Sequence, residues 1–203
     1  MAEKLSKAER TRQFIIQTTA GIFNTKGYAG TSLTDLTEAT GLTKGSIYGN
    51  FENKDEVALA AFDFNLDQVK TLVDQNMAKA SSCYEKLMAF VNVYDKINRS
   101  GSPRGGCPVL NTAVEADDTH ALLKNKAATA INQWRSRIAE LLRTGIENGE
   151  FHPETNVHQL SISIVALIEG GIMITKVTDD KSNFEHITRT VQLILSQIQI
   201  NKS

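Results

Sequence analysis

Apolar residues recur every three or four positions along most of this chain, which is the spacing of a helix with one buried face. No stretch beyond residue 54 shows the strict alternation of apolar and polar residues that would predict a strand. The pattern predicts helices over roughly 84–98, 108–116, 119–148 and 157–178, and a last helix whose apolar stripe runs from Phe184 to Ile198. We therefore expect an all-α protein.

Two short helices separated by a glycine turn are predicted between residues 31 and 57. Ser32 followed by Asp35 is a capping signature, because this pair satisfies the free amides of an opening helix. Gly41 supplies the positive φ angle that a sharp helix end requires, and Thr43 can cap the second helix. This arrangement predicts a helix-turn-helix.

The outward face of the second helix carries no large aliphatic residue. Small and polar residues at a helix N-terminus let the backbone approach a DNA groove, and the free amides attract phosphate. The predicted DNA-binding residues are Ser32, Thr34, Thr43, Lys44, Gly45, Ser46, Tyr48, Gly49, Asn50 and Lys54. The alternative interpretation is a capped surface helix with no nucleic-acid partner.

Residues 11–60 resemble the N-terminal domain of the TetR family of bacterial transcriptional regulators. The matching segments are Ile15-Ile16, Ile22-Phe23, Gly27-Tyr28, Thr31-Ser32, Gly41 to Tyr48 and Phe51 to Glu56. Two positions depart from the family pattern, which usually has alanines at Thr18-Thr19 and often an aromatic residue and a histidine at Gly49-Asn50. The second departure removes potential DNA contacts and leaves the bases that are read open.

The resemblance implies a three-helix DNA-binding domain over residues 1–53 and a larger helical domain for ligand binding and dimerisation over residues 54–203. It implies a homodimeric repressor that binds a pseudo-palindromic double-stranded operator and is released by a small-molecule effector or a reactive electrophile, without a cofactor. Small residues at Ser163, Ala166 and Gly170 would let a partner helix approach closely, so that the last two helices form a four-helix bundle. Burial within one chain is the competing explanation for their apolar content.

A pocket for the effector is expected between facing helices of the larger domain. Trp134 is the strongest candidate, because it is the only tryptophan and a buried indole N–H needs a partner. The candidate ligand-binding residues are Phe90, Tyr94, Cys107, Asn111, Glu115, Trp134, Glu169 and Met173. Ordinary core packing is the alternative at each of these positions.

The segment from Arg104 to Pro108 resembles a subset of TetR-like regulators that carry a Gly-Cys-Pro motif, some of which respond to electrophiles or oxidants. The start of a helix and Arg104 could both stabilise a Cys107 thiolate, and Gly105 and Gly106 would leave the thiol unshielded. The alternative is that Cys107 only caps the helix that begins at Pro108.

Charge gives little support for a nucleic-acid partner, because the net charge of the 203 residues is −1. Residues 1–60 carry seven basic and seven acidic side chains, so DNA affinity must depend on local placement. Lys4, Lys7, Arg10 and Arg12 could form a basic arm, or a solvated terminus.

Other function classes find weak support in the sequence. The chain shows no signal segment and no long uninterrupted apolar run, so we expect a cytoplasmic protein without a membrane partner. Its four histidines lack metal-ligand spacing, and we expect no metal site and no catalytic residues. A thiol enzyme centred on Cys107 and a helical adaptor without DNA binding remain the rival interpretations.

Overall fold

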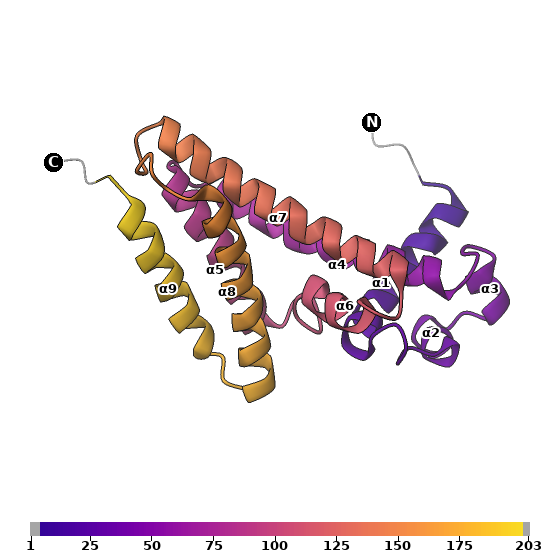
Figure 1. Ribbon diagram of the computed structural model, residues 1–203. Helices are drawn as coiled ribbons and strands as arrows, with labels where there is room; N and C mark the ends of the chain where they lie inside the picture. The colour runs from indigo at the N-terminus through magenta and orange to yellow at the C-terminus, as the bar shows by residue number, and fades with distance from the viewer. Residues whose placement is uncertain (1–4, 201–203) are drawn as a thin grey trace. The chain divides into compact units, whose positions relative to one another are not determined.

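The computed structural model describes residues 5–200, and within that range it contains nine helices and no strand (Figure 1). The helices are α1 (Lys7–Lys26), α2 (Leu33–Thr40), α3 (Lys44–Tyr48), α4 (Lys54–Met77), α5 (Cys83–Ser100), α6 (Pro108–Ala116), α7 (Ala121–Glu147), α8 (Val157–Thr178) and α9 (Asn183–Ile198). The all-α prediction is confirmed. The ranges predicted for α5 to α8 agree with the structure to within two residues at each end.

The helices pack into two compact units. The first joins the chain up to Gln68 with Pro103–Lys126, and the second joins Val69–Ser102 with the chain from Ala127 onward. Packing therefore places α6 in the same unit as α1, α2 and α3. The predicted boundary at residue 53 separates a DNA-binding domain from a ligand-binding and dimerisation domain. It does not coincide with the boundaries of these packing units, and it stays a prediction.

The helix-turn-helix is built by the caps that the sequence predicts. Ser32 Oγ accepts from the Asp35 N–H at 3.1 Å, and the Asp35 carboxylate accepts from the Ser32 N–H at 2.8 Å. Lys26 also donates to Asp35 at 2.6 Å, and this bond, followed by those from Ser32, lowers the pKa of Asp35 to about 2. Gly41 ends α2 with φ of 66°. The inward residues of both helices join one core with α1 and α4: Ile15, Leu36, Ile47, Phe51, Val57 and Ala61.

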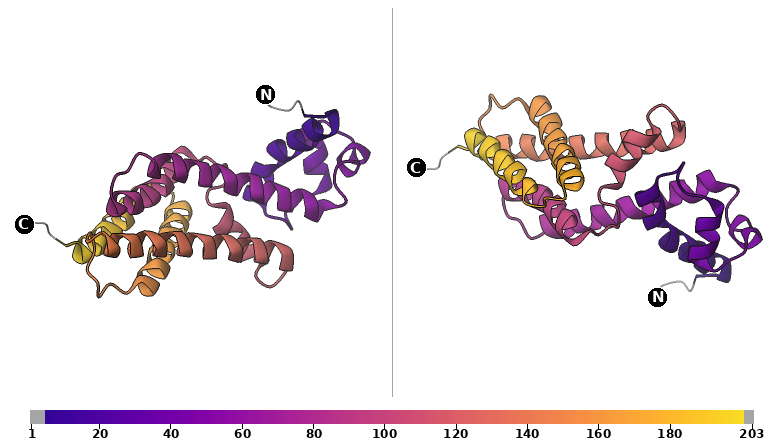
Figure 2. Two further views of the ribbon diagram at one scale, coloured as in Figure 1. Left: turned by 90° about the horizontal axis from the view of Figure 1, so that it is seen from above. Right: turned by 90° about the horizontal axis from the view of Figure 1, so that it is seen from below.

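The second unit is a bundle in which α5 packs against both α8 and α9, and the last two helices lie side by side (Figure 2). Buried positions on α8, such as Ile164 and Ile168, face this bundle together with Val191 and Leu195 of α9. By length and composition alone, the 22-residue α8 could also cross a membrane. Core helices of soluble proteins pass the same test, and the burial of one face of α8 fits that explanation.

Candidate nucleic-acid interface and its contact with helix α6

Helix α3 presents an open outward face. Thr43 Oγ1 caps the helix by accepting from the Ser46 N–H at 3.2 Å, while Ile47 points inward and is fully buried. Lys44, Gly45 and Ser46 are exposed, as predicted for residues that meet DNA. The other predicted contacts at Ser32, Thr34, Thr43 and Gly49 are exposed as well, and those at Tyr48, Asn50 and Lys54 are half-buried.

Arg12 packs against the helix-turn-helix and does not extend away from it. Its guanidinium donates to the Asn50 carbonyl and to the Glu56 carboxylate, the latter at 2.6 Å, and lies 4.0 Å from the centroid of the Phe51 ring. Arg12 thus already has partners within its own chain, and its part in the basic arm stays a prediction. Lys7 and Arg10 are exposed at the start of α1, and Lys4 lies outside the described residues.

Lys54 fastens the turn between α1 and α2 to the start of α4. Its Nζ donates to the carbonyls of Tyr28 and Thr31, at 2.7 and 2.8 Å, and lies 4.1 Å from the centroid of the Tyr28 ring. The Tyr28 hydroxyl donates to Asp55, and this bond is the main reason why the pKa of Tyr28 rises to about 12. A phosphate contact by Lys54 stays a prediction, and its ammonium already has these two carbonyl partners.

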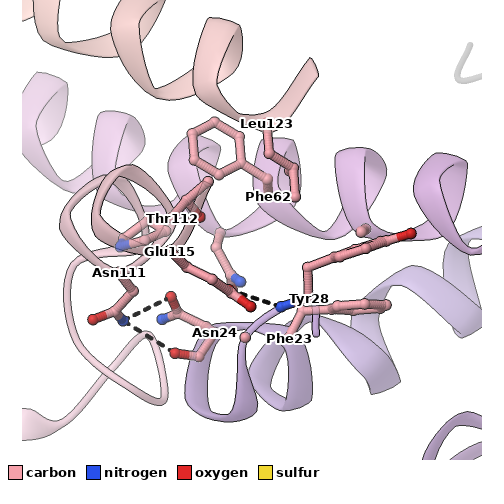
Figure 3. A pocket seen from close by; sticks show the side chains of 12 residues that line it. Phe23, Asn24, Tyr28, Phe62, Asn111, Thr112, Glu115 and Leu123 are labelled. Carbon is pink, nitrogen blue, oxygen red and sulfur yellow. Dashed lines mark hydrogen bonds between the residues drawn. The ribbon is translucent and has the colours of Figure 1, made fainter. Parts of the chain in front are cut away.

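A set of polar contacts joins α6 to the end of α1 (Figure 3), and we call it the α1–α6 clasp. The Glu115 carboxylate accepts from the backbone N–H groups of Tyr28 and Ala29, both at 2.8 Å. Asn111 donates to the carbonyl and side-chain oxygens of Asn24, both at 3.0 Å. The clasp comprises Asn24, Asn111 and Glu115 with the backbone of Tyr28 and Ala29.

The clasp leaves little free space around it. Asn24 Nδ2 donates in turn to the carbonyls of Arg104 and Gly106, at 2.8 and 2.9 Å, which fixes the loop before α6. At Gly27, where φ is 74°, a Cβ atom would lie 2.3 Å from a Glu115 oxygen. The adjacent cavity of about 30 Å³ has room for about one water molecule. Asn111 and Glu115, predicted as ligand contacts, are thus engaged with α1.

Three of the other predicted ligand-binding residues meet in the second unit. The rings of Phe90 and Tyr94 have centroids 5.4 Å apart, and Trp134 meets Tyr94 edge-on at 5.6 Å. All three side chains are buried, which is equally consistent with an ordinary core. Glu169 is half-buried, and Met173 is 50% exposed.

Comparisons with known proteins decide the family. Residues 15–61 match the family model of bacterial regulatory proteins of the tetR family, and residues 83–191 match that of the tetracyclin repressor-like C-terminal domain. The chain belongs to the TetR family.

Two solved structures and one further relative agree with this assignment. A TetR-family regulator from Cytophaga hutchinsonii is 46% identical, with a TM-score of 0.94 over 98% of this chain and 100% of the other. A TetR regulator from Chloroflexus aurantiacus is 34% identical, with a TM-score of 0.91 over 97% and 100%. The uncharacterized HTH-type transcriptional regulator YxaF of Bacillus subtilis is 28% identical over 91% of this chain and 95% of its own.

A TetR-family chain is a helix-turn-helix transcriptional regulator and not an enzyme, so the interpretation as a thiol enzyme is wrong. Regulators of this family bind operator DNA, dimerise and bind small-molecule effectors. The individual contact residues predicted above stay predictions.

In this TetR-family chain the Cys107 thiol is shielded. Its side chain is 1% exposed, and Sγ caps α6 by accepting from the Leu110 N–H at 3.5 Å. The expectation that Gly105 and Gly106 leave the thiol open to reagents is wrong, because the side chain is buried. Cys83 is buried too, and burial, followed by the charge of Glu150, raises its pKa.

We expect both thiols of the native protein to react slowly with the thiol reagent DTNB at pH 8. Because each must be exposed by local opening first, the rates should be at least ~100-fold below those in urea-unfolded protein, which serves as the control. Single-cysteine variants Cys83→Ser and Cys107→Ser assign each rate. A Cys107 thiol that reacts in the native state as fast as in the unfolded state would contradict the buried-cap role.

Proposed function

We propose that this TetR-family regulator is a cytoplasmic homodimeric repressor that binds a pseudo-palindromic operator through α3 and leaves it when a small molecule binds. The supporting observation is the combination of an open α3 face with the α1–α6 clasp. The α3 face provides a surface that fits a DNA groove. The clasp connects the helix-turn-helix unit to α6, which lies further along the chain.

The dimer would use α8 and α9. Apolar residues on these helices remain exposed in the single chain, and they are Ile162, Met173, Ile174, Val177 and Leu193. A second copy presenting the same helices would cover them in a four-helix bundle. A Cβ atom added at Gly170 meets nothing within 4 Å, which leaves room for a close partner. Leu195, in contrast, is 0% exposed and packs within its own chain, so intrachain burial is the correct explanation there.

The effector would act through α6. This short helix carries Asn111 and Glu115, and it is flanked along the chain by α5 and α7, which supply the Phe90, Tyr94 and Trp134 cluster. A ligand that prefers the clasp-broken arrangement by about 1–3 kcal/mol would weaken operator binding roughly 5- to 150-fold. By reciprocity, operator DNA would weaken ligand binding by the same factor.

We assign the Gly-Cys-Pro segment a structural part in this mechanism. Gly105 and Gly106 adopt positive φ angles of 95° and 84°, and Asn24 holds the Gly106 carbonyl. Cys107 then caps α6. A reversible, non-covalent effector is therefore favoured over an electrophile acting on this buried thiol.

A gel-shift titration with the DNA upstream of the protein's own coding region tests this function. Wild-type protein should form one discrete complex, and Lys44→Ala should weaken it at least about tenfold and reduce the slope of log affinity against log salt concentration by about 2, since one phosphate contact is lost in each of the two subunits. Lys124→Ala, which removes an exposed lysine from α7, is the matched control and should bind like wild type. Equal affinity of the Lys44→Ala and Lys124→Ala variants for this DNA would argue against DNA recognition by α3.

A further inference from the structure

The second unit contains an open cavity of about 310 Å³ between α7 and the beginning of α8. Seven residues line it, namely Asn132, Arg135, Ser136, Ala139, Arg143, His158 and Ser161. None of them belongs to the aromatic cluster, and none is acidic. The lining is thus polar and basic, unlike the apolar interior of the bundle.

Both arginines of this cavity lack a carboxylate partner within 4.0 Å anywhere in the described part of the chain. Arg137, two positions from Arg135 on the same helix, pairs with Asp74 at 2.5 Å. Arg135 Nε is buried and has no hydrogen-bond partner among residues 5–200. A guanidinium that lines a cavity without a carboxylate partner leaves its charge uncompensated, and an anion bound in the cavity would compensate it.

The surroundings hold Arg135 in place and add to the positive potential. Asn132 Oδ1 accepts from an Arg135 terminal nitrogen at 3.2 Å, which restrains the guanidinium. His158 and Ser161 lie near the start of the 22-residue α8, and the N-terminal end of a long helix carries partial positive charge. These groups all favour an anion.

We propose that this cavity binds a small metabolite that carries two acidic groups, either carboxylates or phosphates. Arg135 and Arg143 are eight residues apart on one helix, about 12 Å along its axis, so each can hold a separate acidic group. The volume lies at the lower end of the range for small-molecule sites, which excludes a folded partner. The exposed side chains of Ser136 and Asn132 supply neutral hydrogen-bonding groups for the middle of the ligand.

Isothermal titration calorimetry on the full chain at low ionic strength tests the proposal. The probes are succinate and fructose 1,6-bisphosphate, which carry two acidic groups each, with inorganic phosphate as the probe that carries a single group. At least one diacidic probe should bind once per chain and at least tenfold more tightly than phosphate. Arg135→Gln and Arg143→Gln should each weaken it at least tenfold, whereas Arg189→Gln, which removes an exposed arginine from α9, should change affinity less than twofold.

Absence of binding by both diacidic probes would overturn the proposal, as would Arg135→Gln and Arg143→Gln proteins that bind like wild type. An equal loss in Arg189→Gln would show attraction by surface charge only. Should Arg135→Gln fail to fold, Ser136→Glu places a carboxylate at the cavity from an exposed position and should abolish binding. Binding is measured without DNA, so the result stands whether or not the repressor mechanism does.

Discussion

Replacement of Gly170 by leucine is expected to convert the dimer into monomers and to weaken operator binding about 100-fold or more. Within its own chain the new side chain has space, since nothing lies within 4 Å of a Cβ atom at this position. In the proposed four-helix bundle it would push the partner helix away. The loss of DNA binding follows because two linked DNA-binding domains bind with an affinity roughly 10²- to 10⁴-fold higher than that of one domain. Sedimentation velocity and gel shift on the same preparation measure the two effects.

Gly171→Leu is the matched control for this prediction. A Cβ atom there would lie 2.9 Å from Ile187 and 3.1 Å from Phe184, so the substitution disturbs the chain's own core. It should lower the unfolding midpoint, whereas Gly170→Leu should leave the fold of each chain intact by circular dichroism. Leu193→Glu, at a position that is 59% exposed, should repeat the Gly170→Leu result. A Gly170→Leu protein that still sediments as a dimer would place the interface elsewhere.

Glu115→Ala is expected to lower the free energy of unfolding by about 2–3 kcal/mol. Hydrogen bonds to a charged group contribute about 1.5–3 kcal/mol each, and the variant loses two, partly replaced by water at the exposed Ala29. The amides of Tyr28 and Ala29 should then exchange with deuterium at least tenfold faster. Urea unfolding and hydrogen exchange with mass spectrometry provide the two measurements.

Two further variants define what the Glu115 result means. Glu115→Gln keeps one carbonyl acceptor and should lose about half as much stability. Val114→Ala, at an exposed neighbouring position of α6, should change it by less than about 0.5 kcal/mol. Glu115→Ala with wild-type stability and unchanged amide exchange would show that the clasp contributes nothing in solution.

Much of the fold was predictable because its signals are local. The Ser32 and Asp35 pair, the glycine at position 41 and the Thr43 cap each act within four residues of chain, and all three are present in the structure. Helical periodicity likewise gives the bounds of α6 and α8. These features depend on hydrogen bonds and burial that neighbouring residues determine by themselves.

The clasp and the Arg12 contacts could not be predicted in this way. Arg12 meets Glu56 across 44 residues of chain, and Asn24 meets Asn111 across 87. The sequence contains one signal for Asn24, which is that a polar amide directly follows Phe23, a residue of the apolar stripe of α1. A buried amide indicates a hydrogen bond, but the sequence does not show which residue is its partner. The burial of Cys107 could not be predicted for the same reason. Its capping role is local, but its burial depends on residues that are distant in the sequence.

The stripe on α9 shows a second limit of sequence patterns. Apolar residues cover more than one face of this helix, so periodicity cannot separate those that face the same chain from those that face a partner. The structure separates them, with Leu195 inside and Leu193 outside.

The buried edge-on contact between Tyr94 and the single tryptophan also gives the protein an intrinsic optical sensor. Trp134 is the sole source of indole fluorescence, and in its apolar surroundings its emission should lie to the blue of that of a solvated indole. An effector that enters the aromatic cluster must change the neighbours of the Trp134 ring, and hence the emission wavelength or the intensity of its fluorescence. Compound libraries can therefore be screened on the unlabelled natural chain, before any operator is known.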